Sequence, residues 1–396
     1  MNEVISEAAS GGRQGGRSSA TEALGQWLAL ADVRLDGERP WDIRLLQPGV
    51  PERVLAGGSL AFGEAYMDGA WSCERLDELF TRLIRARLGE NVHGLSMAWH
   101  VLRAKLLNLQ NPRRAWQVGR EHYDLGNDFY AAMLDARMTY TCAYWQGSGP
   151  GGEGRPAATT LDQAQEAKLD LVCRKLGLQP GMRVLDIGCG WGSFMGFAAE
   201  HYGVRCVGIT ISEQQAELGR QRLAHLPVEF RLQDYREVDE RFDRVVSLGM
   251  FEHVGHKNYP DYMAMARRCL ADDGLFLLHT IGRNDTADGT DPWIDRYVFP
   301  NGELPSIARL ARAVEPHFVV EDLHNFGADY DRTLMAWHRN FEAAWPRFGA
   351  ELGERFYRRW RYYLLCCAGA FRARDIQLWQ WVLSPRGVPG GYRRVS

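Results

Sequence analysis

The amino-acid sequence predicts an α/β protein in which a smaller α+β module precedes a doubly wound, mainly parallel sheet. Three observations support this prediction. The 396 residues exceed the size at which a single core stops growing. Helical and strand patterns alternate from residue 161 onward, as parallel strands joined by crossover helices require. A glycine-rich turn at 188–192 lies between a strand and a helix, where such sheets bind ligands.

The composition restricts the possible partners and compartment. Hydrophobic residues make up 45% and charged residues 24% of the chain, and the formal net charge of −3 predicts no bulk attraction to nucleic acid. Residues 1–20 hold no continuous apolar segment, so we expect a disordered tail, no signal peptide and a cytoplasmic protein. The apolar run at 362–371 is about half the ~20 residues that a membrane-spanning helix needs.

The cysteines are expected to be free thiols. None of the eight forms a CxxC pair or has a His/Cys spacing suited to zinc. In a reducing compartment, disulfides are rare. Cys142, in the sequence "MTYTCAYW" at 138–145, is therefore expected to be neither half of a disulfide nor a metal ligand. We expect no metal site.

The first module is expected to span 21–120. Short alternating strands come first, and helical spacing follows from about residue 59. Between Arg82 and Arg120 there are eight Lys or Arg residues and one acid, Glu90. Such a stretch is either a solvated helix face or a contact for a membrane surface or nucleic acid, and the residues alone leave these alternatives open.

The catalytic part is expected to span 121–396. Its helices and strands follow one another until a polar, turn-rich insert at 283–327, and an insert of this kind after a strand can cover a site. Two long helical stretches are expected after the insert. The expected helices are 161–178, a segment from Gly192, 213–224, 262–270, 330–345 and 354–383, and the expected strands are 183–188, 204–210, 228–233, 242–249 and 274–281.

The glycine turn distinguishes two cofactor classes. Gly188, Gly190 and Gly192 are spaced by two and follow Asp186, whereas the dinucleotide fingerprint is G-x-G-x-x-G. The turn resembles the E/DxGxG motif of class I S-adenosylmethionine-dependent methyltransferases, which have a Rossmann-like sheet. That resemblance implies contacts to the adenine at the end of the third strand, where this chain has Asp234, Tyr235 and Arg236.

An acid and two histidines are expected on the same edge of the sheet as the glycine turn. Glu252 and His253 follow the fourth strand, and His279 lies late in the fifth. Each of them alone would be an ordinary capping or core residue. Together, beside a cofactor site, they indicate that the protein moves or holds a proton.

Seven segments resemble one family over residues 30–385. They are "GEAYMDGAW", "EHYDLGNDFY", "MTYTCAYW", "SLGMFEHVGHKNY", "LLHTIG", "NFGADYDRTLMAW" and "CAGAFRARDIQLWQ". The family is that of the cyclopropane-fatty-acyl-phospholipid synthases, relatives of the mycolic acid cyclopropane synthases. The resemblance implies that the methyl of S-adenosylmethionine adds across a cis double bond of an acyl chain in membrane phospholipid, and that loss of a proton closes a ring.

The resemblance also implies roles for individual residues. Tyr123 would face the carbocation, and Cys367 occupies a position assigned as an active-site cysteine, which we expect to line the acyl pocket. A bound bicarbonate ion would be the base, held by Cys142, Glu252, His279, the backbone of Ile281, and Tyr330. The implied cofactor residues are Tyr140, Thr141, Val184, Leu185, Asp186, Ile187, Gly188, Cys189, Gly190, Trp191, Gly192, Thr210, Ile211, Ser212, Glu213, Gln214, Gln215, Tyr235 and Arg236.

A phospholipid substrate favours the membrane interpretation of the basic stretch. We expect 82–120 and the "RFYRRWR" run at 355–361 to contact anionic head groups at the inner face of the membrane. The part of the insert around 293–306 would cover the acyl site, and the family precedent suggests a homodimer. Three alternatives remain: a methyltransferase that makes methylene or methyl-branched chains, a non-catalytic lipid-binding relative, and, disfavoured by the glycine spacing, a nicotinamide-dependent oxidoreductase.

Overall fold

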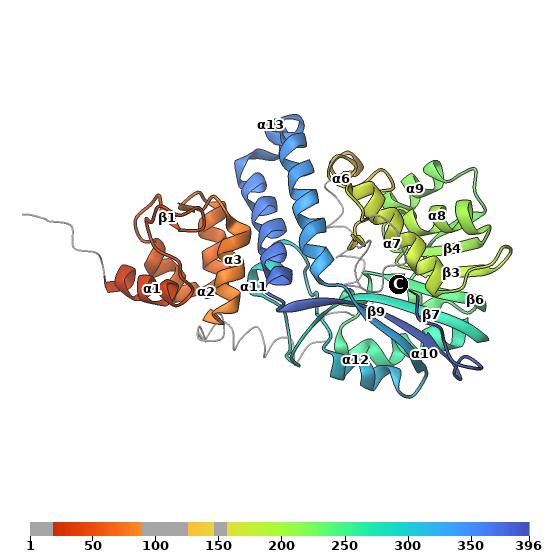
Figure 1. Ribbon diagram of the computed structural model, residues 1–396. Helices are drawn as coiled ribbons and strands as arrows, with labels where there is room; N and C mark the ends of the chain where they lie inside the picture. Colours follow the sequence, from red (N-terminus) through yellow and green to blue (C-terminus); the bar gives the residue numbers. More distant parts are fainter. Residues whose placement is uncertain (1–18, 89–125, 146–156, 396) are drawn as a thin grey trace, which may run out of the picture.

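The computed structural model describes residues 19–88, 126–145 and 157–395. A seven-stranded sheet forms the centre, with strand order β5-β4-β3-β6-β7-β9-β8 (Figure 1). The first five of these strands are parallel, and β9 runs antiparallel to both β7 and β8. The strands are β3 (Arg183–Ile187), β4 (Arg205–Thr210), β5 (Val228–Leu232), β6 (Phe242–Leu248), β7 (Leu270–Arg283), β8 (Val319–Asn325) and β9 (Ile376–Ser384). The predicted doubly wound, mainly parallel sheet is confirmed.

Alternate residues of the central strand face two separate cores. Leu185 and Ile187 of β3 pack on one face of the sheet, in a core that includes Tyr262. Val184 packs on the other face, in a core that includes Phe194. Because both faces are covered, β3 is apolar on both sides, as expected for a parallel strand. The covering helices are α7 (Leu161–Lys175), α8 (Ser193–Tyr202), α9 (Glu213–Arg222), α10 (Tyr259–Cys269) and α12 (Ile307–Val314).

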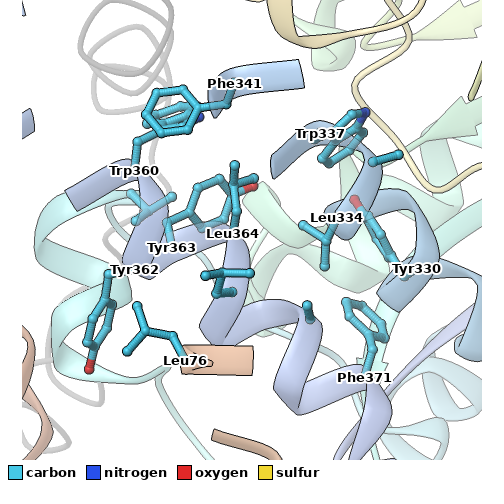
Figure 2. Close-up of a cluster of buried hydrophobic side chains, with 14 of the residues drawn as sticks. Leu76, Tyr330, Leu334, Trp337, Phe341, Trp360, Tyr362, Tyr363, Leu364 and Phe371 are labelled. Atoms are coloured by element: carbon cyan, nitrogen blue, oxygen red, sulfur yellow. The ribbon is translucent and has the colours of Figure 1, made fainter. Parts of the chain in front are cut away.

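The first module packs against the long C-terminal helix. It consists of α1 (Ser19–Leu30), β1 (Arg44–Leu45), α2 (Val50–Met67), β2 (Trp71–Ser72) and α3 (Leu76–Arg85). Helix α13 (Ala328–Arg372) has non-helical backbone at Gly353, and its two halves lie side by side (Figure 1). A Cβ at Gly369 would lie 2.7 Å from Cβ of Phe80, so α3 and α13 approach closely. Figure 2 shows Leu76 of α3 in one aromatic cluster with side chains from both halves of α13.

Ion pairs reinforce this contact. The Arg372 guanidinium lies 2.7 Å from a carboxylate oxygen of Asp77 in α3 and 2.8 Å from one of Asp331 in α13. Arg358 and Arg361, from the run expected to contact lipid, donate to the carbonyl and the hydroxyl of Tyr66 in α2. That part of the 355–361 run therefore holds the first module.

The end of the expected helix 354–383 is wrong. The helix stops at Arg372, and Arg374 has a positive φ of 64°, which helices do not tolerate. The sequence "IQLWQWVLS" then forms β9 between β7 and β8, because its aromatic and β-branched residues fit a strand buried on both faces. The insert is not entirely irregular either, since it contains α11 (Pro292–Tyr297), α12 and β8.

Several expectations lie outside the described residues. The tail, the proposed boundary at 120, most of the basic stretch and Tyr123 fall in 1–18 or 89–125. The division into domains therefore stays a prediction. Within the described part of the chain, no helix is long and apolar enough to cross a membrane.

Candidate active site

A pocket opens where β3, β4, β5 and β6 end. It lies at the edge that the strand pattern predicted, because the carboxyl ends of parallel strands meet there. Fifteen of the implied cofactor residues line it: Tyr140, Thr141, Asp186, Ile187, Gly188, Cys189, Gly190, Trp191, Thr210, Ile211, Ser212, Gln215, Asp234, Tyr235 and Arg236.

The remaining five implied cofactor residues lie behind or beside the pocket. Val184 and Leu185 are fully buried in the two cores. Gly192 precedes α8 as its N-cap, and Glu213 and Gln214 are exposed in the first turn of α9. These positions shape the strand and the helix ends without lining the pocket.

The glycine turn brings backbone to the pocket wall. Gly188, Gly190 and Gly192 have φ values of 81°, 55° and 83°, which favour glycine. A Cβ at Gly190 would meet no atom within 4 Å, whereas one at Gly188 would lie 2.6 Å from Cβ of Met250. Gly190 thus leaves open space in which a ligand can lie directly against the main chain, and this fits a nucleoside cofactor.

Polar groups are fixed at two ends of the pocket. At the β5 end, Asp234 accepts from the backbone N–H of Arg236 at 3.0 Å and from its guanidinium at 2.8 Å. At the β3 end, Asp186 is buried, and burial raises its pKa to about 7. Its Oδ1 has no hydrogen-bond partner among the described residues. An unpartnered buried acid of this kind fits a ligand that carries positive charge.

Some pocket residues were not anticipated as cofactor contacts. Gly249, Met250 and His253 follow β6, and the same strand-end rule would have found them. Pro300 and Asn301 come from the insert, and no local pattern indicates them. The other unanticipated lining residues are Met138, Ser193, Phe194, Ile209, Gln233 and Leu248.

Glu252 and Ile281 lie together just outside the pocket. Oε1 of Glu252 accepts from the backbone N–H of Ile281 at 2.7 Å. Its Oε2 is buried without a hydrogen-bond partner among the described residues. Burial raises the pKa of Glu252 to about 7, so the carboxyl takes up a proton far more readily than an exposed one.

His279 belongs to the same edge. Its carbonyl accepts from the N–H of Gly249 at 2.9 Å, and its Nδ1 lies 3.2 Å from the side-chain nitrogen of Gln380 on β9. Nε2 is buried and has no hydrogen-bond partner in the described chain. Burial, with the nearby Lys168 and Lys175, holds the pKa of His279 well below its usual value, so the imidazole is neutral.

Cys142 and Tyr330 come from segments that are fastened together. The N–H of Ala143 donates to Oγ1 of Thr333 at 3.1 Å, which ties the strap containing Cys142 to the first turns of α13, where Tyr330 lies. Cys142 is fully buried, and burial raises the pKa of its thiol well above the usual value. Such a thiol carries little thiolate and is a poor nucleophile.

Tyr140 extends the aromatic surface from the pocket toward α13. Its hydroxyl lies 3.0 Å from that of Tyr363, and its ring centre lies 5.1 Å from that of Trp337. Cys367 is one helical turn beyond Tyr363 and half-buried. None of Cys142, Glu252, His279, Ile281, Tyr330 and Cys367 lines the cofactor pocket itself.

The insert is fastened over Glu252. The N–H of Glu303 donates to the carbonyl of Glu252 at 2.8 Å, and the Glu303 carboxylate lies 2.7 Å from Nδ1 of His256 and 3.0 Å from the guanidinium of Arg309. His256, Glu303 and Asp288 have the spacing of metal ligands, but Arg309 already contacts both carboxylates. The cluster thus works as an ion-paired clamp on the insert.

Such a sheet, with its glycine turn and pocket at the strand ends, defines the class I S-adenosylmethionine-dependent methyltransferases. Within this class the chain belongs to the mycolic acid cyclopropane synthetase family, whose model matches residues 110–381. The chain is 52% identical over 367 residues to the cyclopropane-fatty-acyl-phospholipid synthase of Escherichia coli (strain K12), covering 92% of this chain and 93% of that protein. The resemblance inferred from the sequence is confirmed.

Solved structures agree. The cyclopropane synthase MmaA2 from Mycobacterium tuberculosis is 33% identical, with a TM-score of 0.62 over 68% of this chain and 97% of that chain. The mycolic acid cyclopropane synthase CmaA1 complexed with SAH and CTAB is 35% identical, with a TM-score of 0.61 over the same shares. This chain is therefore a methyltransferase that uses S-adenosylmethionine.

Proposed function

We propose that the protein transfers the methyl of S-adenosylmethionine to a cis double bond of an unsaturated acyl chain in membrane phospholipid and closes a cyclopropane ring. The observation that carries the proposal is a buried acid and imidazole, Glu252 and His279, at the same sheet edge as the methyl-donor pocket, whose Oε2 and Nε2 have no partners in the described chain. The similarity to the Escherichia coli synthase, which extends through the first module, supports the phospholipid as substrate.

The chemistry explains the aromatic surroundings. The π electrons of the alkene form the new bond to the methyl carbon, the C–S electrons stay on sulfur, and the neighbouring alkene carbon becomes cationic. Aromatic rings stabilise such a cation by ~1 to 2 kcal/mol each when water is excluded. Tyr140, Trp337 and Tyr330 lie in one ring cluster, with ring centres 5.1 and 5.9 Å apart in successive pairs.

Ring closure requires a base for one proton of the added methyl. As that proton leaves, its C–H electrons form the third bond of the ring. We assign the base to a bicarbonate ion held by Cys142, Glu252, His279, the backbone of Ile281 and Tyr330. The unpartnered Oε2 and Nε2 fit this group, because a protonated carboxyl and a neutral imidazole can both donate hydrogen bonds to an anion. Tyr123 is proposed to face the cation and Cys367 to line the acyl pocket.

Access to the acyl chain is proposed to occur at the membrane surface. The first module with its basic stretch at 82–120 would contact anionic head groups at the inner face of the membrane, while the clamped insert covers the site. The protein would then be a peripheral cytoplasmic protein, and its family suggests a homodimer.

The test is incubation with labelled S-adenosylmethionine and vesicles of cis-monounsaturated phospholipid, with and without bicarbonate. Products should gain one CH₂ and resist olefin-specific reagents, and the rate should rise with bicarbonate. A product of the same mass that still reacts as an olefin would instead indicate a methylene-forming enzyme. No turnover on such vesicles would support a non-catalytic lipid-binding protein.

A further inference from the structure

A lysine inside the protein faces the methyl-donor pocket from behind. Lys168 of α7 is 0% exposed, and its Nζ donates to Oγ1 of Thr141 at 2.8 Å. Thr141 is its one hydrogen-bond partner in the described chain, and no carboxylate there lies within ion-pair distance of Nζ. Since lysine is almost never fully buried without a partner, this charge calls for a functional explanation.

Thr141 is held in a single orientation. Its carbonyl accepts from the Gln165 amide at 2.8 Å, and this hydrogen bond ties the segment of Thr141 to α7. Its methyl lies against Gly249, where an added Cβ would be only 2.8 Å away. Oγ1 therefore points to Lys168, and the rotation of the side chain is fixed by contacts on both sides.

The ammonium group of Lys168 determines whether the Thr141 hydroxyl donates or accepts a hydrogen bond toward a ligand. An ammonium group only donates, so Oγ1 must accept from it and keeps its own hydrogen for another acceptor. The described residues offer that hydrogen no acceptor, and Thr141 lines the pocket. Thr141 is thereby set as a hydrogen-bond donor toward a ligand.

We propose that Lys168 is a positioning residue that fixes Thr141 as a donor to the amino-acid carboxylate of S-adenosylmethionine. This inference rests on the methyl-donor assignment above. The donor's amino-acid part carries one carboxylate and one ammonium group. At the β3 end of the pocket, Lys168 with Thr141 matches the carboxylate, and the unpartnered Asp186 matches the ammonium. The other end, with Asp234 and Tyr235, is left for the adenosine.

The charged groups around Lys168 come from several elements. Asp135 already accepts from the backbone of Arg137 and Thr139, Asp186 ends β3, and Cys142 and His279 complete the surroundings. Burial lowers the pKa of Lys168 to about 8, and Asp135, Cys142 and Asp186 counteract this shift, so the group is charged at neutral pH. A charge that is buried and without a close counter-ion attracts a ligand carboxylate strongly.

The chain offers a matched control on the same helix. Lys175 lies two turns further along α7, is also 0% exposed, and has a pKa that burial lowers to about 8. Its Nζ lies 3.0 Å from Nδ1 of His324 and 3.6 Å from a carboxylate oxygen of Asp322. Among the described residues, its Nζ makes no hydrogen bond to Thr141. Lys168→Met and Lys175→Met therefore remove the same buried charge in different places.

The test is titration calorimetry on the full chain with S-adenosylhomocysteine and with 5′-methylthioadenosine, which lacks the amino-acid part. Lys168→Met should weaken S-adenosylhomocysteine by tenfold or more and change methylthioadenosine by less than twofold, whereas Lys175→Met should change neither. Equal weakening of both ligands by Lys168→Met, or of neither, would overturn the proposal. Failure of the wild type to bind S-adenosylhomocysteine would instead overturn the methyl-donor assignment.

A second pair of variants keeps the test decisive if Lys168→Met does not fold. Thr141→Val should lose S-adenosylhomocysteine affinity selectively, and Thr141→Ser should retain it. Where Lys168→Met folds, the loss in the double variant Lys168→Met with Thr141→Val should be smaller than the sum of the two single losses, because part of the lysine's effect acts through the hydroxyl. Additive losses would show that the two residues act independently and would contradict the assignment.

Discussion

Replacing Glu252 with Gln should stabilise the ligand-free protein at alkaline pH. In the folded protein, burial raises the pKa of this carboxyl to about 7 from its ordinary value of 4.5. Between these values the folded state binds more protons than the unfolded chain, so stability falls as the pH rises through this window. Gln retains the oxygen that accepts from Ile281 and has no charge to lose.

The size of the effect follows from the shift. Because the pKa of Glu252 is higher in the folded protein than in the unfolded chain, this group lowers the free energy of unfolding by about 1 kcal/mol at pH 5 and by about 3 kcal/mol at pH 8. An amide in place of the unpartnered Oε2 adds a burial cost that does not depend on pH. The difference in unfolding free energy between Glu252→Gln and wild type should therefore grow by ~2 kcal/mol between pH 5 and pH 8.

Urea unfolding of both proteins at the two pH values measures this difference. Glu303→Gln is the control, because Glu303 is a buried glutamate paired with His256 and Arg309, and its loss should lower stability at both pH values. A difference between Glu252→Gln and wild type that is the same at pH 5 and pH 8 would refute the conclusion that burial raises the pKa of Glu252.

Three other outcomes are expected. The affinity of the wild type for S-adenosylhomocysteine should fall as the pH rises past about 8, because Lys168 then loses the positive charge that favours binding of the ligand carboxylate. Calorimetry should show a weaker dependence of affinity on pH for Lys168→Met. Cys142→Ser should reduce turnover without affecting S-adenosylhomocysteine binding, and a covalent lipid adduct in the mass spectrum of the wild type would contradict this. Gly63→Ala would place a Cβ 2.3 Å from Trp293, so thermal unfolding should show a loss of ~1 to 3 kcal/mol; an unchanged midpoint would mean that the insert shifts freely.

The parallel half of the sheet was predictable because the sequence features that indicate it lie within short stretches of the chain. Apolar strands and the spacing of Gly188, Gly190 and Gly192 each depend on a few neighbouring residues. Residues that follow strand ends, such as Asp234 and Glu252, could be placed on one edge without further information, since parallel strands impose that edge.

The antiparallel half was not predictable by the same means. The sequence of β9 is apolar and follows a helix directly, and short apolar stretches do not distinguish a strand from a buried helix. Its pairing with β7 joins residues about 100 positions apart, such as His279 and Gln380. Lys168 was missed for a related reason, because a lysine on an amphipathic helix is ordinarily expected to face solvent.

The aromatic cluster shared by α3 and α13 links the two ends of the chain mechanically. Thr333, near the start of α13, holds the segment of Cys142, while Arg372, at its end, holds Asp77 of the first module. Close packing transmits displacement instead of absorbing it. A displacement of the first module would therefore reach the segment of Cys142 through the two halves of α13, and an engineer who wished to graft this module onto another methyltransferase would have to transplant α13 with it.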